Sequence, residues 1–506
     1  MTENFNPFLT EYHTPFGTTP FHLIKTEHFE PAMEEGMKTH NREVDDIVNC
    51  TDAPTFSNTI VALEKSGALL DCVTTVFGNL LSAETNDELE ALAERMMPRL
   101  SEHSNNISLN EKLFARIKQV YDETKQGALS QEDYMLLQNT YNSFIRNGAN
   151  LTSEQKERFR QLSAELSVLT LKFSQNNLKE TNRYELLLTP EQTDGLPTSA
   201  LDAYAQAAKD KNQEGYLVTL QAPSFVPFMK YSSHRELRKQ LYMAYNTQCT
   251  HDDEFNNLEI VQKLVNLRLE RAQLLGYSTV ADYVLSKRMA ENSDNVYKLL
   301  NELLDAYKPT AHQEVEDVKT LAKELEGKDF ELMPWDWAYY SEKLKEKKFN
   351  LNEEELRPYF ELKKVIQGVF GLATRLYGIT FQENPNIPVY HPDVKAYEVK
   401  DKDDSFLAVL YTDFHPRASK RSGAWMTNYK EQWKDENGNS RPHVSVTMNF
   451  TKPSEEKPAL LTFSEVNTFL HEFGHALHGI FANTTYQSMS GTNVYWDFVE
   501  LPSQFM

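Results

Sequence analysis

The segment from Thr462 to Phe481 constrains the fold most, because its pattern predicts one amphipathic helix with two different faces. Thr462 and Glu465 form the capping-box pattern that begins a helix. At 100° per residue, a set of apolar side chains then lies within about 60° on one face. These side chains are Val466, Leu470, Phe473, Leu477, Ile480 and Phe481. We therefore expect a helix that buries one face in a core and turns the other face toward a cleft.

The cleft side of this helix carries His471, Glu472 and His475. Histidines four residues apart are neighbours on a helix, and neutral imidazole is a preferred zinc ligand. Glu472 points in a different direction from the imidazoles, so we expect it beside a metal-bound water and not on the metal. A pair of surface histidines without a metal is the alternative. His478, on the same side, is interpreted as a residue of the cleft wall.

A third metal ligand is predicted at Glu500, in a second helical pattern that runs from Asn493 to Phe505. Val494, Phe498, Leu501 and Phe505 share one face of this pattern, and Glu500 points away from it. Three protein ligands leave one coordination position open, as in catalytic zinc sites. Asp497 is a candidate acceptor for the second ring N–H of a ligand histidine. A solvated aspartate is an equally good interpretation, and Pro502 is expected to kink the helix.

Residues from about 55 to 327 are predicted to be mainly helical. Thr152 and Gln155 form a capping box, and the apolar stripe that follows recurs at intervals of three and four. The stripe consists of Phe159, Leu162, Leu166, Leu169 and Phe173. Two further helices are expected. One extends from about Asn257 to Leu275 and ends at Gly276, and the other begins near Ser293 and is bent or divided by Pro309.

After Pro388 the pattern becomes that of strands. Residues 397–399 and 406–411 flank the polar run Asp401–Asp404, which predicts a β-hairpin. Residues 444–450 alternate apolar and polar side chains, which is typical of a half-buried strand. Gly423 is interpreted as part of an ordinary loop more readily than as a point of close backbone approach. A small antiparallel sheet is therefore expected before the metal-binding helix.

Composition excludes some classes of partner and compartment. The chain has 52 basic and 74 acidic residues and a net charge of −22, which argues against nucleic acid or an anionic membrane as the main partner. The absence of a run of about 18 apolar residues predicts no membrane-spanning segment. Cys50, Cys72 and Cys249 are widely spaced and suit a reducing compartment. Since residues 1–17 lack a signal-peptide pattern, we expect a cytoplasmic protein, or a periplasmic one if a leader was removed.

Two segments carry a resemblance to a known family. Residues 471–481 read HEFGHALHGIF, and residues 490–504 read SGTNVYWDFVELPSQ. They resemble the thimet oligopeptidase and neurolysin family of zinc peptidases, with the bacterial peptidyl-dipeptidase (dipeptidyl carboxypeptidase) branch as the nearer match. Four further segments are similar to that branch, namely Asn6–Leu9, Pro334–Tyr340, Pro388–Val394 and Gly423–Met426.

The resemblance implies that His471, His475 and Glu500 hold one zinc ion and that Glu472 is the general base for a zinc-bound water. It implies a mostly α, zincin-like fold: a two-lobed helical shell around a deep channel, with a small antiparallel β-sheet next to the zinc-binding helix. Residues 1–330 would form a mainly helical lobe, and residues 331–506 the catalytic region. Such a channel implies short, unfolded peptides as substrates, which lose a dipeptide from the C-terminus.

The resemblance also implies that the catalytic region is incomplete at its C-terminal end. Members of that family continue through a helical segment whose histidine and tyrosines hold the oxyanion and the substrate. We therefore expect a truncated sequence or a missing C-terminal segment, exposed apolar residues near Glu500, and little activity for the chain alone. The alternatives are a broader-specificity oligopeptide endopeptidase of the same family, and an inactive fragment or metal-free helical binding protein.

Overall fold

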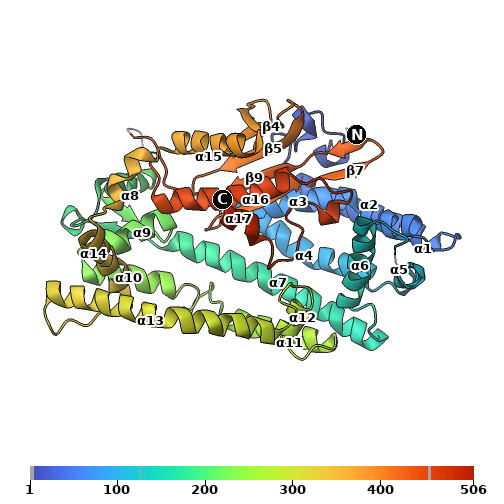
Figure 1. The fold of residues 1–506 in the computed structure, drawn as a ribbon, viewed down its shortest axis with the longest axis horizontal. Helices are drawn as coiled ribbons and strands as arrows, with labels where there is room; N and C mark the ends of the chain where they lie inside the picture. Colours follow the sequence, from blue (N-terminus) through green and yellow to red (C-terminus); the bar gives the residue numbers. More distant parts are fainter. Residues whose placement is uncertain (1–4, 126, 454–456) are drawn as a thin grey trace.

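The computed structural model describes residues 5–125, 127–453 and 457–506, and these residues form a mainly helical molecule (Figure 1). Up to residue 330 the elements are α1 (Thr26–Asn49), α2 (Ala62–Lys65), α3 (Ala68–Ala83), α4 (Asp87–Ser108), α5 (Glu111–Glu123), α6 (Gln131–Arg146), α7 (Ser153–Arg183), β1 (Leu186–Leu188), α8 (Thr198–Asp210), β2 (Tyr216–Val218), α9 (Ala222–Tyr231), α10 (Arg235–Asn246), α11 (Leu258–Leu274), α12 (Val280–Leu285) and α13 (Ser293–Glu326).

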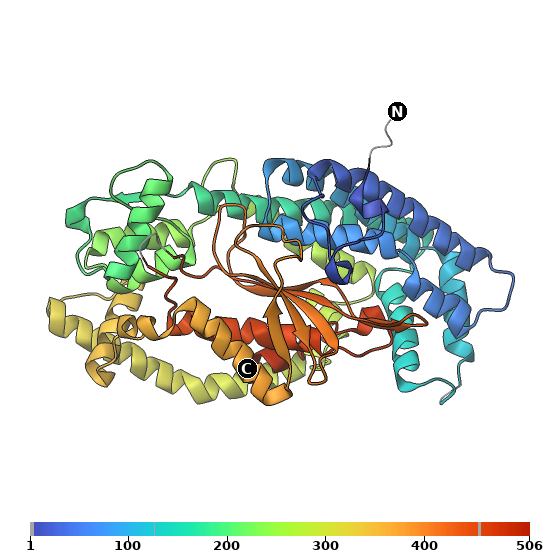
Figure 2. The same ribbon diagram turned by 90° about the horizontal axis from the view of Figure 1, so that it is seen from above.

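The rest of the described chain adds a five-stranded sheet, a two-stranded sheet and four α-helices. These elements are α14 (Trp337–Phe349), α15 (Leu362–Tyr377), β3 (Thr380–Glu383), β4 (Lys395–Lys400), β5 (Phe406–Asp413), β6 (Trp425–Lys430), β7 (Trp433–Asp435), β8 (Gly438–Ser440), β9 (His443–Thr447), α16 (Phe463–Ile480) and α17 (Glu500–Phe505). In Figure 1, α13 runs along the lower edge, α7 lies above it, and the sheet with α16 lies at the top. Seen from above, the sheet lies between the N-terminal helices and α16 (Figure 2).

The sheet that precedes α16 has the strand order β3-β4-β5-β9-β6. The expected hairpin is confirmed, since β4 and β5 pair antiparallel with Tyr397 opposite Leu410. The expectation of a wholly antiparallel sheet is wrong at one pair, because β5 and β9 run parallel. Parallel neighbours need a long connection, and the chain between β5 and β9 supplies one that contains β6, β7 and β8.

Strands β5 and β9 are buried on both faces. In β5, Val409 and Tyr411 belong to a core shared with Phe29 of α1, while Leu410 belongs to a second core shared with Phe473 of α16. All five residues of β9 are buried, including the polar Ser445. The prediction of a half-buried strand was therefore wrong, because helices cover both sides of a strand whose polar positions suggested solvent.

Most of the predicted helices are present. Thr152 caps α7 with the expected capping box, and its stripe is buried at the N-terminal half, whereas Phe173 is 38% exposed. The helix predicted to end at Gly276 is α11, and Gly276 has the left-handed φ of +88° expected after a helix. Pro309 does not divide α13, because the helix is 34 residues long and runs through Pro309 without a break. Among the described residues, no helix has the length and apolarity needed to cross a membrane.

Short turns of helix complete the chain. They lie at Pro7–Leu9, Pro15–Gly17, Phe56–Val61, Pro190–Gln192, Pro334–Asp336, Glu353–Glu355, Arg357–Tyr359 and Gln487–Met489.

Candidate metal centre

Both ends of α16 are fixed by side chains. At the start, Thr462 accepts a hydrogen bond from the backbone N–H of Glu465, and the Glu465 carboxylate accepts one from the N–H of Thr462 at 2.7 Å, as the capping-box pattern predicted. At the other end, Arg441 donates to the carbonyl oxygens of Ile480 and Ala482 at 2.6 and 2.8 Å. These bonds occupy backbone groups that a helix end leaves unpaired, so α16 is held at a defined position beside the sheet.

One face of α16 is packed into the core that it shares with the sheet. Its buried apolar residues are Phe469, Phe473, Ala476, Leu477 and Ile480. Val466 and Leu470 are partly buried against the same core. Phe481, also expected on this face, is 39% exposed, because the helix ends at Ile480 and the chain then turns away.

The second segment has a different local structure from the one predicted. Residues 496–499 form turns, and the helix begins only at Glu500, so the expected helix from Asn493 is wrong in its first half. Pro502 lies in the first turn of α17, where a missing N–H disturbs no helical hydrogen bond, and it therefore produces no kink. As expected, Phe498, Leu501 and Phe505 are exposed, at 36%, 59% and 73%.

The α17 backbone crosses α16 at Gly474, which lies between the two candidate histidine ligands. A Cβ atom at this position would come within 2.5 Å of the Pro502 carbonyl oxygen and 2.6 Å of the Ser503 Cα. Only glycine permits so close an approach of two backbones. Gly474 thus allows α17 to bring Glu500 over the histidines, a role that sequence reasoning missed, although a glycine within a helical pattern is a recognised signal of close packing.

The three predicted ligands converge on one point. The Nε2 atoms of His471 and His475 lie 3.1 and 3.2 Å from Oε2 of Glu500. One donor atom from each of the three residues lies within 4.8 Å of the others. A tetrahedral zinc ion with ligand distances of about 2.0–2.2 Å would separate its ligand atoms by roughly 3.4 Å. Two imidazole nitrogens and a carboxylate oxygen at these distances therefore fit a zinc ion in both chemistry and spacing.

Ser503 orients the carboxylate of Glu500. Its hydroxyl, which is buried, donates a 2.6 Å hydrogen bond to Oε2, the same oxygen that faces both histidines. This hydrogen bond is the main cause of a lowered pKa at Glu500, and the two histidines contribute to it as well. The side chain of Glu500 is therefore kept ionised and directed at the imidazoles. The sequence pattern offered no signal for Ser503 beyond its position three residues after Glu500.

Glu472 lies beside this group but outside it. The residue is 7% exposed, and burial, followed by the negative charge of Glu500, raises the pKa of Glu472 to about 7. A carboxyl group with such a pKa can both accept and release a proton near neutral pH. Glu472 therefore lies beside the three candidate metal ligands without being one of them.

Asp497 does not contact a ligand histidine. Its carboxylate accepts hydrogen bonds from the backbone N–H groups of Met289 and Ala290 at 3.0 and 2.9 Å. It thus connects the turn before Glu500 to the loop between α12 and α13. Nδ1 of His475 is buried and has no hydrogen-bond partner among the described residues. Nδ1 of His475 therefore lacks the hydrogen-bond acceptor that the sequence suggested at Asp497.

Comparisons with known proteins identify a family and several relatives. Residues 228–506 match the model of peptidase family M3. The chain is 36% identical to dipeptidyl carboxypeptidase of Escherichia coli over 502 residues, which are 99% of this chain and 73% of that protein. It is 35% identical to oligopeptidase A of the same organism over 508 residues, 99% of this chain and 74% of that protein. A solved structure of a putative oligoendopeptidase F from Bacillus anthracis is 14% identical, with a TM-score of 0.46 over 88% of this chain and 64% of that one.

Proposed function

Because the chain belongs to peptidase family M3, we propose that it is a zinc metallopeptidase that hydrolyses oligopeptides and releases C-terminal dipeptides. The observation that carries the proposal is the convergence of His471, His475 and Glu500 on one point, with Glu472 beside them. These are the four residues that the sequence pattern singled out. We further propose a cytoplasmic location, on the sequence argument alone.

His471, His475 and Glu500 would hold the zinc ion. When bound, zinc acts as a Lewis acid toward the peptide carbonyl and makes water a better nucleophile. Ser503 keeps the Glu500 carboxylate turned toward the imidazoles, so the three donor atoms are arranged before any ion arrives. Such preorganisation favours binding because little side-chain freedom remains to be lost.

Glu472 would act as the general base. Its carboxylate would accept a proton from the attacking water and then deliver that proton to the nitrogen of the departing amine. Burial raises the pKa of Glu472 above its usual value, which favours a carboxyl group that first takes and then gives a proton. Its burial also limits competing exchange with bulk water.

The site of cleavage is the finer part of the proposal. One relative is named a dipeptidyl carboxypeptidase and another an oligopeptidase, and the identities of 36% and 35% are nearly equal. A broader-specificity oligopeptide endopeptidase is therefore the second candidate function. Short, unfolded peptides are the proposed substrates in both cases.

A series of N-acetylated peptides of increasing length tests the cleavage position. We expect mass spectrometry to detect dipeptides released stepwise from the C-terminus, and amidation of the C-terminus to suppress their release. Internal fragments that are independent of the C-terminal carboxylate would support the endopeptidase instead. A folded, zinc-loaded sample that cleaves neither class of peptide would reject both candidates.

A further inference from the structure

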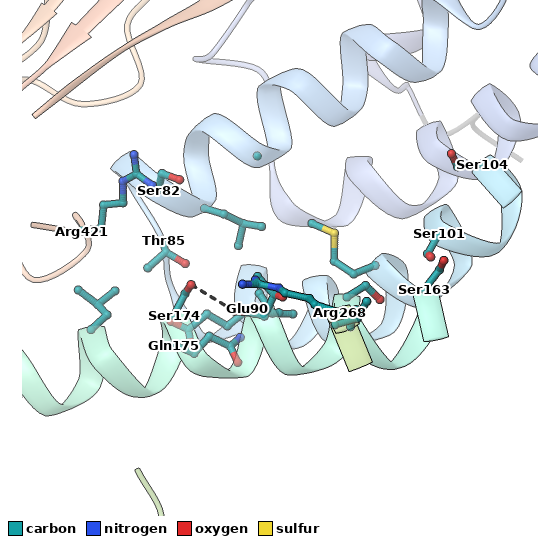
Figure 3. A pocket seen from close by; sticks show the side chains of 18 of the residues that line it. Ser82, Thr85, Glu90, Ser101, Ser104, Ser163, Ser174, Gln175, Arg268 and Arg421 are labelled. Carbon is teal, nitrogen blue, oxygen red and sulfur yellow. Dashed lines mark hydrogen bonds between the residues drawn. The ribbon is translucent and has the colours of Figure 1, made fainter. Parts of the chain in front are cut away.

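A cavity of about 680 Å³ lies apart from the candidate metal centre. It is open to solvent on one side and is lined by residues of α3, α4, α7 and α11 and of the loops before α4 and β6, and none of its lining residues is a candidate metal ligand or Glu472 (Figure 3). Its volume falls within the range of about 300–1,000 Å³ that is typical of small-molecule sites. The cavity is thus large enough for a ligand of its own.

Three arginines line this cavity, namely Arg268, Arg271 and Arg421. Within the described ranges, no carboxylate forms an ion pair with any of them. Arg421 instead stacks on the ring of Trp425 at 4.2 Å. One carboxylate, Glu90, also lines the cavity, but Lys179 pairs with it at 2.8 Å. A protein with a net charge of −22 therefore places three arginines without a carboxylate partner among the described residues around one cavity, and two of them, Arg268 and Arg421, are exposed to solvent.

The positions of the first two arginines are fixed by contacts between α7 and α11. Glu270 accepts two hydrogen bonds from Arg158, at 2.6 and 2.7 Å, and Asn176 donates to Asn257 at 2.9 Å. Arg268 and Arg271 are one turn apart on α11 and so lie on neighbouring positions of one face. Two like charges at this spacing repel each other, and a bound anion would remove that repulsion.

The inner wall carries polar groups without partners. Thr85, Asn105 and Gln175 are each more than nine-tenths buried and line the cavity. The Thr85 hydroxyl and the side-chain N–H₂ groups of Asn105 and Gln175 have no hydrogen-bond partner among the described residues. These three atoms are themselves shielded from the cavity, so they lie behind its surface and are not groups that a ligand there would contact.

We propose that this cavity binds a small organic anion. The arginines hold its carboxylate or phosphate group through charge-assisted hydrogen bonds. An apolar wall accommodates the rest of the molecule. This wall consists of Leu81, Met97, Leu166, Leu171 and Leu178. The proposal goes beyond peptide hydrolysis and does not depend on a metal.

Two pairs of probes distinguish the sources of the anion in titration calorimetry. The first pair is the dipeptide glutamyl-glutamate and its neutral counterpart glutaminyl-glutamine. The second pair is adenosine monophosphate and adenosine. We expect at least one anion to bind about tenfold or more tightly than its neutral counterpart, because hydrogen bonds between the arginines and a charged group are stronger than those to a neutral group. The pair that shows the difference identifies carboxylate or phosphate as the anion.

Two variants assign the binding to this cavity. Arg268→Ala/Arg271→Ala removes two of the three positive charges. Gly78→Leu fills the space while leaving every arginine in place, since a Cβ at Gly78, which lines the cavity, meets no atom within 4 Å. Gly371→Leu is the matched control, because Gly371 is an exposed helical glycine with equally open surroundings in α15. Both cavity variants should weaken anion binding at least about tenfold, and the control should not.

Equal binding of anions and neutral probes by the wild type would overturn the proposal. Retention of full affinity in either cavity variant would overturn it as well, because the anion would then be bound elsewhere. Since the readout is binding and not turnover, a failure here leaves the proposed peptidase activity untouched.

Discussion

At the scale of single residues, one carboxylate oxygen organises the candidate metal centre. Oε2 of Glu500 faces the Nε2 atoms of His471 and His475 and accepts the hydroxyl hydrogen bond of Ser503. Glu472 remains outside this arrangement and is the most deeply buried carboxylate beside it. The roles proposed for these side chains can be separated by substitutions that remove one property at a time.

Glu472→Gln should abolish peptide hydrolysis and preserve zinc binding. Glutamine has nearly the same shape but cannot take a proton, and general base catalysis typically contributes about 10²–10⁴ in rate. Turnover and zinc content are measured on the same purified sample. Activity like that of the wild type would remove Glu472 from the mechanism.

Ser503→Ala should lower zinc affinity by about 10–100-fold, the usual effect of losing a partner that orients a metal ligand. The measurement is a competition titration with a chelator. Ser464→Ala is the control, because Ser464 is an exposed serine in the first turn of α16, away from Glu500. Unchanged affinity in the Ser503 variant would show that the carboxylate needs no orienting hydrogen bond.

At the scale of elements, the centre depends on how closely α17 crosses α16. The crossing occurs at Gly474, where the Pro502 and Ser503 backbone occupies the space of a side chain. A short helix of six residues has little stability of its own, so its position is determined by this contact.

Gly474→Ala should therefore displace α17 and weaken zinc binding, although alanine is normally favoured over glycine in a helix by about 1 kcal/mol. Gly371→Ala is the matched control, since its added methyl group meets nothing within 4 Å. We expect the control to keep its zinc affinity and gain a little stability. Metal content and thermal unfolding distinguish the two. Full zinc affinity in Gly474→Ala would contradict the close crossing.

At the scale of the whole molecule, a buried charge cluster joins the N-terminal helices to the sheet. Asp413, at the end of β5, binds Lys420 at 2.6 Å and Arg417 at 2.7 and 2.9 Å. Arg417 also donates to Glu84, just after α3. Burial alone would raise the pKa of Asp413, but hydrogen bonds from Arg417 and the charge of Lys420 lower it below its usual value. The cluster therefore needs an ionised Asp413.

Asp413→Asn should destabilise the protein by about 3–5 kcal/mol at neutral pH, because it leaves the buried Lys420 without its counter-charge and Arg417 with Glu84 alone. The pKa of Asp413 is lower in the folded state than in the unfolded state, so the stabilisation that its carboxylate provides is complete above the pKa of the unfolded state. This stabilisation is lost as pH falls through the pKa of the folded state. Urea unfolding at several pH values should show that the difference in unfolding free energy between wild type and variant narrows as pH falls below about 4. Glu30→Gln, at an exposed ion pair, is the control, with an effect of about 1 kcal/mol or less.

The division into a helical lobe, residues 1–330, and a catalytic region, residues 331–506, stays a prediction. Side chains from both ranges share one apolar core, in which Phe29 and Phe77 pack with Val409 and Tyr411. Cores of this kind arise between elements far apart in sequence, and local patterns carry no information about them.

Local patterns were sufficient for much of this protein. Capping boxes located the starts of α7 and α16, and glycine located the end of α11. The spacing of His471, Glu472 and His475 identified the candidate centre, because neighbouring positions on one helix surface follow from helix geometry alone. These features depend on interactions within a few residues of chain.

The remaining features were decided by tertiary structure. The parallel pairing of β5 and β9 and the burial of Ser445 depend on helices that pack from both sides, so the alternating pattern of residues 444–450 was misleading. The turns before Glu500 replaced a helix that periodicity favoured. Sequence by itself determined which side chains could bind a metal, since donor chemistry and helical spacing are local. Only the crossing at Gly474 decided that Glu500 meets the histidines, because that approach depends on the shape of two backbones in contact.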